Sequence, residues 1–175
     1  MKTLKQYLTE RLVIKKKSYN YFPETKEELQ EIIKQRIDQK GPEVDLNDID
    51  VSNITDMSVL FENFNDFNGD ISQWDVSKVT NMESMFYECA VFNQDLSNWN
   101  VSNVTNMYSM FNGCKAFNQD ISAWDVSKVA NMSFMFRGCK SFNQDISAWD
   151  VSKVNKSLDM FFKCPINEKY KPQFK

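Results

Sequence analysis

Residues 107–129 read MYSMFNGCKAFNQDISAWDVSKV, and this string returns along the chain in nearly the same form every 25 residues. Writing the chain in rows of that length aligns one tryptophan per row, at Trp74, Trp99, Trp124 and Trp149. A phenylalanine column accompanies it, at Phe61, Phe86, Phe111, Phe136 and Phe161. Self-similarity at a fixed period of about 20–50 residues is typical of proteins in which each repeat stacks on the next. The sequence therefore predicts an array of coils that share one core.

Each unit divides into two halves with different periods. The first half alternates apolar and polar residues around Trp74 and Val76, within the L-x-x-L-x-L spacing of a leucine-rich repeat, which predicts a short strand. The second half predicts a short helix, because apolar residues recur at i, i+3, i+4 and i+7, at Met82, Met85, Phe86 and Cys89. A loop at residues 92–95 closes the coil. We therefore predict an α/β repeat fold, a leucine-rich-repeat-like right-handed solenoid of about five coils.

The flanks of the repeat suggest how its ends are covered. We expect residues 1–20 to be a leader or helix, 21–44 a capping helix, 45–164 the solenoid and 165–175 a C-terminal cap or tail. Thr25 and Glu28 form a capping box, and Gly41 is placed to end the helix. Because terminal coils of an array expose an apolar end, we expect this helix to cover the first coil.

The composition argues against several function classes. The chain has no histidine, which removes the commonest general base and the commonest metal ligand. A net charge of −3 disfavours a nucleic-acid partner. No apolar stretch approaches the roughly 20 residues of a membrane span, and the start of the chain lacks a signal-peptide pattern. We therefore predict a monomeric, non-enzymatic protein without cofactor or membrane span, in the cytoplasm or a virion rather than secreted.

The repeated string resembles the BspA-like leucine-rich-repeat proteins of the surface-protein and lipoprotein type, from about Leu46 to Cys164. This resemblance implies a leucine-rich-repeat-like solenoid with a role in adhesion or protein interaction, although many members have no established function. The chain departs from the surface members in showing no export signal.

The outward residues of the predicted strand are the candidates for a binding face. They should form ladders on the concave side of the solenoid, at Asp50, Gln73, Asp75, Asn98, Asn100, Asp125 and Asp150. Stacked carboxylates on strands about 4.8 Å apart repel one another unless lysines, cations or water compensate. Three interpretations stay open: a solvated and partly salt-bridged face, a surface for a basic partner, or a bound cation. Our leading hypothesis is contact with a protein or glycan; we claim no metal site and no catalytic residue.

Two further columns favour structural roles. Asp70, Asp95, Asp120 and Asp145 precede each predicted strand, which favours carboxylates that close turns. Four cysteines recur at the repeat interval, at Cys89, Cys114, Cys139 and Cys164. Their place in the core pattern predicts buried, reduced thiols rather than disulfides.

The first ten residues carry a second resemblance. They are similar to the capsid-targeting leader of internal head proteins in large tailed phages, which a maturation protease removes after a Leu-x-Glu or Ile-x-Glu triplet. Leu8, Thr9 and Glu10 fit that triplet and are a candidate cleavage motif. The resemblance implies an alternative function, that of a phage virion or head-internal structural protein. The other interpretation of this segment is a frayed or cap-packed terminus.

Overall fold

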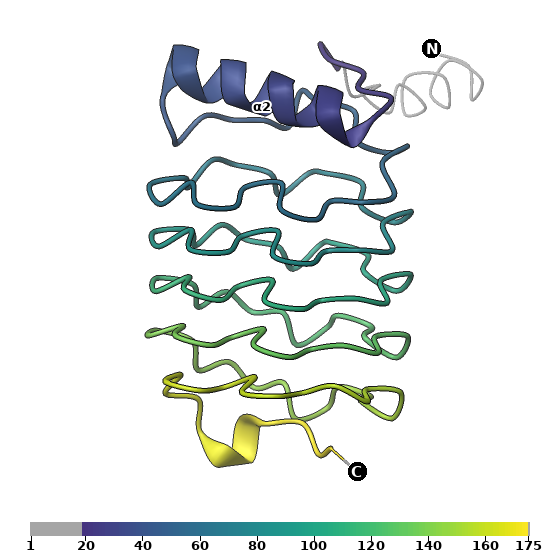
Figure 1. The fold of residues 1–175 in the computed structure, drawn as a ribbon, viewed down its shortest axis with the longest axis vertical. Coiled ribbons are helices and arrows are strands. Elements are labelled where there is room, and N and C mark those ends of the chain that lie inside the picture. The colour runs from purple at the N-terminus through teal and green to yellow at the C-terminus, as the bar shows by residue number, and fades with distance from the viewer. Residues whose placement is uncertain (1–18, 175) are drawn as a thin grey trace, which may run out of the picture.

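The computed structural model describes residues 19–174, which wind into a stack of coils beneath one helix (Figure 1). Helix α2 spans Lys26–Lys40, and the 3-10 helix η1 spans Glu168–Tyr170. The rest of the described chain has turns and isolated parallel bridges between coils, but no strand. The predicted α/β leucine-rich-repeat solenoid is therefore wrong, because neither its strands nor its repeating helices form.

Ribbons of consecutive turns replace the predicted repeating helices. We call these segments the ribbons; they are residues 57–63, 82–88, 107–113, 132–138 and 157–163. In the second ribbon the Met85 N–H donates three residues back to the Met82 carbonyl at 3.3 Å, whereas the Ser84 N–H donates to the following coil at 2.8 Å. A helix would need every N–H to donate four residues back within the segment. Positive φ angles at Ser84 (51°) and Glu88 (58°) also interrupt a right-handed helix.

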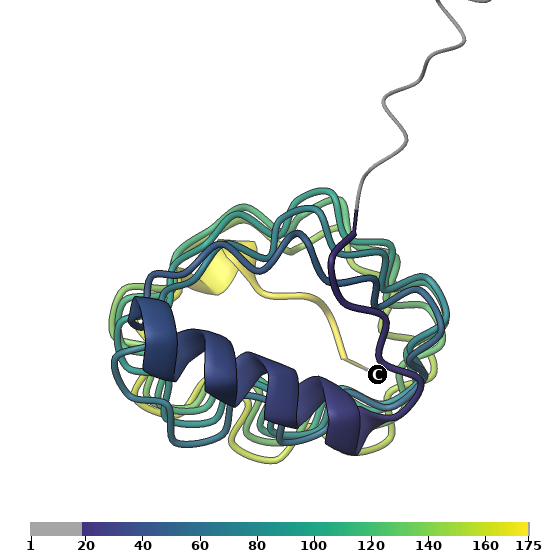
Figure 2. The same cartoon turned by 90° about the horizontal axis from the view of Figure 1, so that it is seen from above.

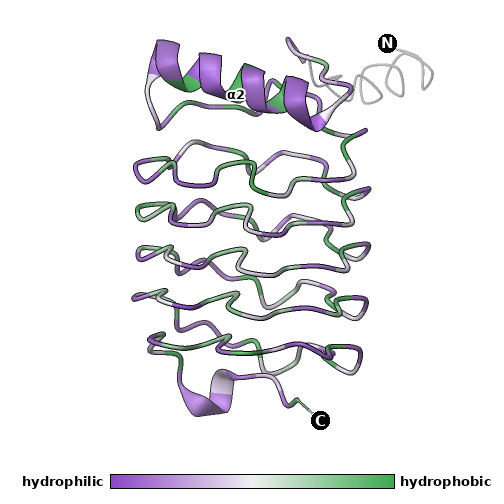
Figure 3. Cartoon of the chain, viewed as in Figure 1, coloured by the Kyte–Doolittle hydropathy of each residue, from purple (hydrophilic) through white to green (hydrophobic). Residues whose placement is uncertain are grey.

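The segments predicted as strands also fold into turns. The Trp74 N–H donates to the Ile71 carbonyl at 3.1 Å, and the Val79 N–H donates to the Val76 carbonyl at 2.9 Å. Such local bonds hold the backbone away from the extended form, although Trp74 and Val76 are buried as the alternation requires. Hydrophobic and hydrophilic residues therefore alternate around each coil without forming a sheet (Figure 3).

Aromatic rings run through the stack in two columns. Neighbouring rings of the first column have centroids 5.4–5.9 Å apart, at Phe61, Phe86, Phe111, Phe136 and Phe161. Those of the second column are 5.9–6.2 Å apart, at Phe67, Phe92, Phe117 and Phe142. Within a coil the two columns meet at 4.1–4.2 Å. Each coil therefore completes the core of its neighbours, and stability comes from the array rather than from one unit.

Side-chain bonds to the preceding coil accompany this core. The Trp99 indole N–H donates to the Ile71 carbonyl at 3.2 Å, and the Cys89 thiol donates to the Phe61 carbonyl at 2.9 Å. In the return loop, the Asn93 N–H donates to Asn68 Oδ1 at 2.9 Å. Equivalent bonds recur in the later coils. The repeated Trp, Cys and Asn residues therefore join one coil to the next.

One predicted structural role is confirmed, and a second is confirmed in part. The carboxylates of the loop column each accept the N–H of the serine two residues later, at Asp70, Asp95, Asp120 and Asp145. All four cysteines are free thiols, but only Cys89, Cys114 and Cys139 are buried as predicted, whereas Cys164 is partly buried.

Helix α2 lies across one end of the stack (Figure 2). Its N-cap is Thr25, whose hydroxyl accepts the Glu28 N–H at 3.2 Å. Gly41 ends the helix with φ 87°, and its N–H donates to the Ile37 carbonyl at 2.8 Å. Leu29 and Ile33 are fully buried in the same core as the coils.

A partly buried ion pair anchors the far half of α2. Arg36 Nη1 contacts Asp48 Oδ2 at 2.8 Å, while Arg36 Nη2 donates to the Asp45 carbonyl at 2.9 Å. The guanidinium also lies over the Tyr21 ring. Burial opposes ionisation of both partners, but hydrogen bonds from Asn20 and Arg36 together with the guanidinium charge lower the pKa of Asp48. The pKa of Arg36 is raised, because its bond to Asp48 outweighs burial.

We expect Phe111→Ala to lower the free energy of unfolding by about 3–5 kcal/mol, because the fully buried ring stacks on Phe86 and Phe136. The matched control is Leu158→Ala, whose side chain is 65% exposed and should change stability by less than about 0.5 kcal/mol. Urea unfolding followed by tryptophan fluorescence measures both. Equal losses in the two variants would contradict the stacked core.

Thiol labelling should separate the cysteines. Burial raises the pKa of Cys89 to about 12 and raises the pKa values of Cys114 and Cys139 well above the usual range. Cys164 is only half-buried. In the native protein at about pH 8, iodoacetamide should therefore modify Cys164 first and the other three only after unfolding, as read by peptide mass spectrometry. Native-state labelling of Cys114 as fast as that of Cys164 would show that the core opens.

Asp48→Asn should reduce stability near neutral pH by about 1.5–3 kcal/mol, because it removes a charged partner from a buried guanidinium. A carboxylate whose pKa is lowered by folding contributes stability above its unfolded pKa of about 3.9, and this contribution is lost as the pH falls through the folded pKa. The difference in free energy of unfolding between the variant and the parent protein should therefore disappear in acid. Asp66→Asn, at an exposed site, is the control. A difference in free energy of unfolding that stays constant down to about pH 2 would refute this role of Asp48.

Candidate functional site

The sequence-predicted binding face lies on turns rather than on a concave sheet. Its repeated side chains each accept, through Oδ1, the N–H of the serine two residues later at 3.0–3.2 Å, at Asp50, Asp75, Asn100, Asp125 and Asp150. Gln73 and Asn98 are exposed at the neighbouring position, where the Gln73 N–H donates to Asn47 Oδ1 at 2.8 Å. These residues lie at equivalent turns of successive coils, which we call the turn face, and Oδ1 of each repeated aspartate or asparagine closes its turn.

Two lysines beside the turn face donate to asparagines of the preceding coil. Lys78 Nζ donates to Asn53 Oδ1 at 2.8 Å, and Lys128 Nζ donates to Asn103 Oδ1 at 2.7 Å, each in the preceding coil. Hydrogen bonds from Ser127, and then the charge of Lys128, lower the pKa of Asp125. Among residues 19–174 no group of three or more Asp, Glu, Cys or His side chains is arranged to hold a metal ion.

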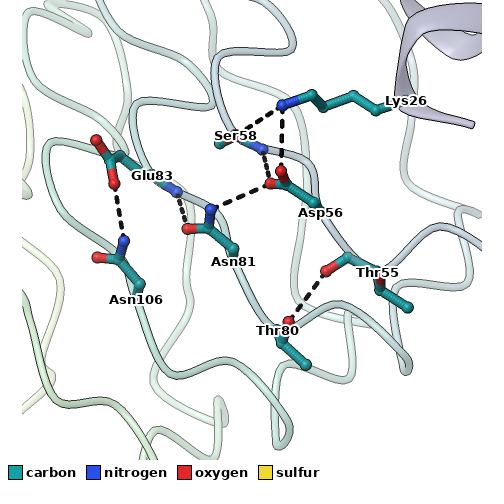
Figure 4. Close-up of polar contacts among 8 residues, drawn as sticks. All are labelled: Lys26, Thr55, Asp56, Ser58, Thr80, Asn81, Glu83 and Asn106. Atoms are coloured by element: carbon teal, nitrogen blue, oxygen red, sulfur yellow. Dashed lines mark hydrogen bonds and ion pairs between the residues drawn. The ribbon is translucent and has the colours of Figure 1, made fainter.

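A polar column connects α2 to the edge of the ribbons (Figure 4). Lys26 Nζ contacts Asp56 Oδ2 at 3.1 Å, and Asn81 Nδ2 donates to Asp56 Oδ1 at 3.1 Å. The column continues where Asn106 Nδ2 donates to Glu83 Oε2 at 2.9 Å. Parallel bridges join successive coils at the same place, at Asp56, Asn81, Asn106, Asn131 and Lys156. These side chains bond to one another inside the protein. We therefore assign the column to the repeated scaffold that holds the coils together, which we call the frame.

The ribbons carry a groove on their outer surface, which we call the ribbon groove. It has a volume of about 420 Å³ and is lined by Glu62, Ser84, Tyr87, Glu88, Tyr108, Ser109, Asn112, Phe134 and Arg137. Four successive ribbons contribute to it. The sequence interpretation did not include these residues, because it placed the binding face on the other half of the coil.

The two ends of the ribbon groove carry different kinds of side chain. At one end the Tyr108 and Phe134 rings meet edge to face with centroids 5.6 Å apart, and the Arg137 guanidinium lies 5.5 Å from the Phe134 centroid. The other end carries the carboxylates of Glu62 and Glu88. The Glu88 carboxylate lies where a side chain at Gly113 would be, since a Cβ there would come within 2.5 Å of its carboxyl carbon.

The lining positions differ from coil to coil, whereas the frame does not. The ribbon position of Tyr108, which lines the groove, is occupied in the other coils by Ser58, Glu83, Ser133 and Leu158. Another is occupied by Glu62, Tyr87, Asn112, Arg137 and Phe162. The predicted face, in contrast, repeats aspartate or asparagine followed by serine in every coil. Variation within a column, from one coil to the next, is therefore the sequence signal that could have located the ribbon groove.

Two other sequence predictions concern the leader and the membrane. The candidate cleavage motif Leu8, Thr9 and Glu10 lies outside residues 19–174, so leader cleavage stays a prediction. Within the described residues, no helix is long and apolar enough to cross a membrane.

Comparison with known proteins gives a family but no activity. The family described as "Mycoplasma protein of unknown function, DUF285" matches residues 28–136 and 97–171, which include α2 from its third residue onward and all five ribbons. No curated protein and no solved structure gave a significant match. The match supports an uncharacterised repeat family and does not bear on the BspA-like or phage resemblances. The chain belongs to the DUF285 family of Mycoplasma proteins of unknown function.

Proposed function

We propose that the chain is a non-enzymatic protein-interaction module that binds a protein partner in the ribbon groove. One observation carries this proposal: the side chains that differ between coils meet in the groove, whereas those that build the frame are repeated. A repeated frame fixes the backbone, and varied side chains on it give one surface a specific shape and charge pattern. Interaction surfaces on stacked repeats arise in this way.

The composition of the ribbon groove favours a protein partner. Tyrosine, phenylalanine and arginine are enriched at protein interfaces, and tyrosine and arginine recur among the residues that dominate binding energy. Tyr108, Phe134 and Arg137 supply this combination at one end. Glu62 and Glu88 at the other end suit a basic side chain of the partner. The groove therefore fits a partner surface with a basic group at one end and an acidic or aromatic group at the other.

The frame beneath the ribbon groove favours tight binding. Alternate N–H groups of the ribbons donate to the next coil at 2.8–3.0 Å, so the backbone under the groove is held on both sides. A surface that is already ordered loses less conformational entropy on binding. Preorganisation of this kind suits recognition of a protein surface.

A catalytic role is the less favoured interpretation. The buried Cys89, Cys114 and Cys139 thiols donate to backbone carbonyls, and burial raises their pKa values, which makes them poor nucleophiles. Acid–base catalysis needs two groups in unlike environments, but the repeated carboxylates of the turn face share one environment in successive coils.

Site-specific crosslinking tests where the partner binds. A photoreactive phenylalanine analogue is placed at Asn112 in the ribbon groove or, as matched control, at Asn98 on the turn face, and both proteins are irradiated in a lysate of the organism that encodes the chain. We expect one protein to crosslink at Asn112 and not at Asn98, as identified by mass spectrometry. Crosslinking only at Asn98 would place recognition on the face first predicted, and no crosslink at either position would refute the proposal.

The identified partner then gives a quantitative check. Arg137→Ala should weaken its binding by about 10- to 30-fold, as expected for a central arginine of an interface. Lys115→Ala, at an exposed position that does not line the groove, should change the dissociation constant less than about 2-fold. Equal dissociation constants for the two variants would contradict binding in the ribbon groove.

A further inference from the structure

The hydrogen bonds between ribbons all point the same way along the stack. In the third ribbon the N–H groups of alternate residues, Met107, Ser109, Phe111 and Gly113, donate to carbonyls of the following coil at 2.8–3.0 Å. The matching carbonyls of this ribbon accept from the preceding coil, at Asn106, Tyr108, Met110 and Asn112. Every ribbon junction therefore pairs a donor edge with an acceptor edge, always in the same order along the chain.

The last ribbon ends in an unpaired donor edge. We call this the terminal edge; it consists of the N–H groups of Ser157, Asp159, Phe161 and Lys163. Within residues 19–174 none of these groups donates a hydrogen bond. The ribbon nevertheless keeps its shape, since the Phe162 N–H donates to the Asp159 carbonyl at 3.0 Å and both Asp159 and Lys163 have the positive φ of the inner ribbons. The terminal edge is thus formed in advance of any partner.

The two ends of the stack are covered differently. Helix α2 lies across the first end and is anchored there by Lys26 and Arg36. At the other end, the segment after residue 164 passes through the middle of the ring in Figure 2, and the Ile146 N–H donates to the Tyr170 carbonyl at 3.0 Å. This segment covers the core, while Leu158 and Phe162 of the last ribbon stay exposed.

The region around the terminal edge is positive on an otherwise acidic chain. Residues 151–174 contain five lysines and two acidic residues, whereas the whole chain has a net charge of −3. Successive N–H groups that point the same way add a partial positive charge and form sites that attract anions. Lys156 and Lys163 are exposed beside the edge. A partner must therefore bring hydrogen-bond acceptors and negative charge.

We propose that the terminal edge docks an extended acidic segment of a protein partner. Carbonyl and carboxylate oxygens of that segment occupy the positions that carbonyls of the next coil occupy at the inner junctions, as in the addition of a strand to a sheet edge. A second copy of the chain does not fit, because its own terminal edge also offers donors and its acceptor end lies under α2. This surface adjoins the ribbon groove, where Arg137 Nη1 contacts Asp159 Oδ2 at 3.1 Å, but docking uses the backbone N–H groups of the last ribbon and not the side chains that line the groove.

The test uses the full chain and two octapeptides, one of glutamate and one of glutamine. We expect the glutamate peptide to shift the backbone amide NMR signals of Ser157, Asp159, Phe161 and Lys163 and to slow their hydrogen exchange. The glutamine peptide should bind at least about 10-fold more weakly, and the affinity for the glutamate peptide should fall with added salt. Shifts spread over other coils, with these four amides unchanged, would overturn the proposal.

Matched charge variants separate docking from general attraction. Lys156→Glu with Lys163→Glu should weaken binding of the glutamate peptide by about 10-fold or more, whereas Lys115→Glu with Lys128→Glu makes the same change in net charge away from the edge and should alter it less than about 3-fold. Equal losses would reduce the interaction to net charge and refute the docking site. Crosslinking at Asn112 reads the ribbon groove alone, so either proposal can fail without the other.

Discussion

The whole stack depends on one interaction, the hydrogen bond from alternate N–H groups of a ribbon to carbonyls of the following coil. These bonds set a fixed register of successive coils, and that register brings each phenylalanine over its equivalent and each loop asparagine within reach of the next. An inserted or deleted residue would displace all of these columns together. The unbroken 25-residue period of the sequence reflects this constraint.

The sequence predicted which residues are buried better than it predicted the shape of the backbone. Met82, Met85, Phe86 and Cys89 are all fully buried, as a helical stripe requires, but they lie on a ribbon. Both structures place residues i, i+3, i+4 and i+7 on one side. They differ in where the N–H groups donate, and apolar spacing does not encode this. The visible hints were Gly113 and Gly138 at positions of positive φ.

Local capping signals were more informative than periodicity. Thr25, Glu28 and Gly41 identified α2 because each acts on backbone groups within a few residues. The carboxylates before each serine were predicted to close turns for the same reason, and they do. The same preference of aspartate and serine for local bonds removed the predicted strands. The error in the fold therefore came from applying turn chemistry to one aspartate column while treating the other, Asp75 and its equivalents, as part of a strand.

The candidate site could not be found by looking for repetition, because repeated residues serve contacts that every coil must make. Asp75 and its equivalents close turns, whereas Tyr108 and Arg137 hold positions that the frame leaves open to variation. Frame and recognition surface thus have opposite signatures in one sequence. The hydrogen bonds between ribbons add a property that no side chain encodes. Because each coil donates to the next, the first ribbon of the described stack has free acceptors and the last has free donors. Under the two proposals, such a stack would bind one partner along its side through varied side chains and another at its end through the backbone.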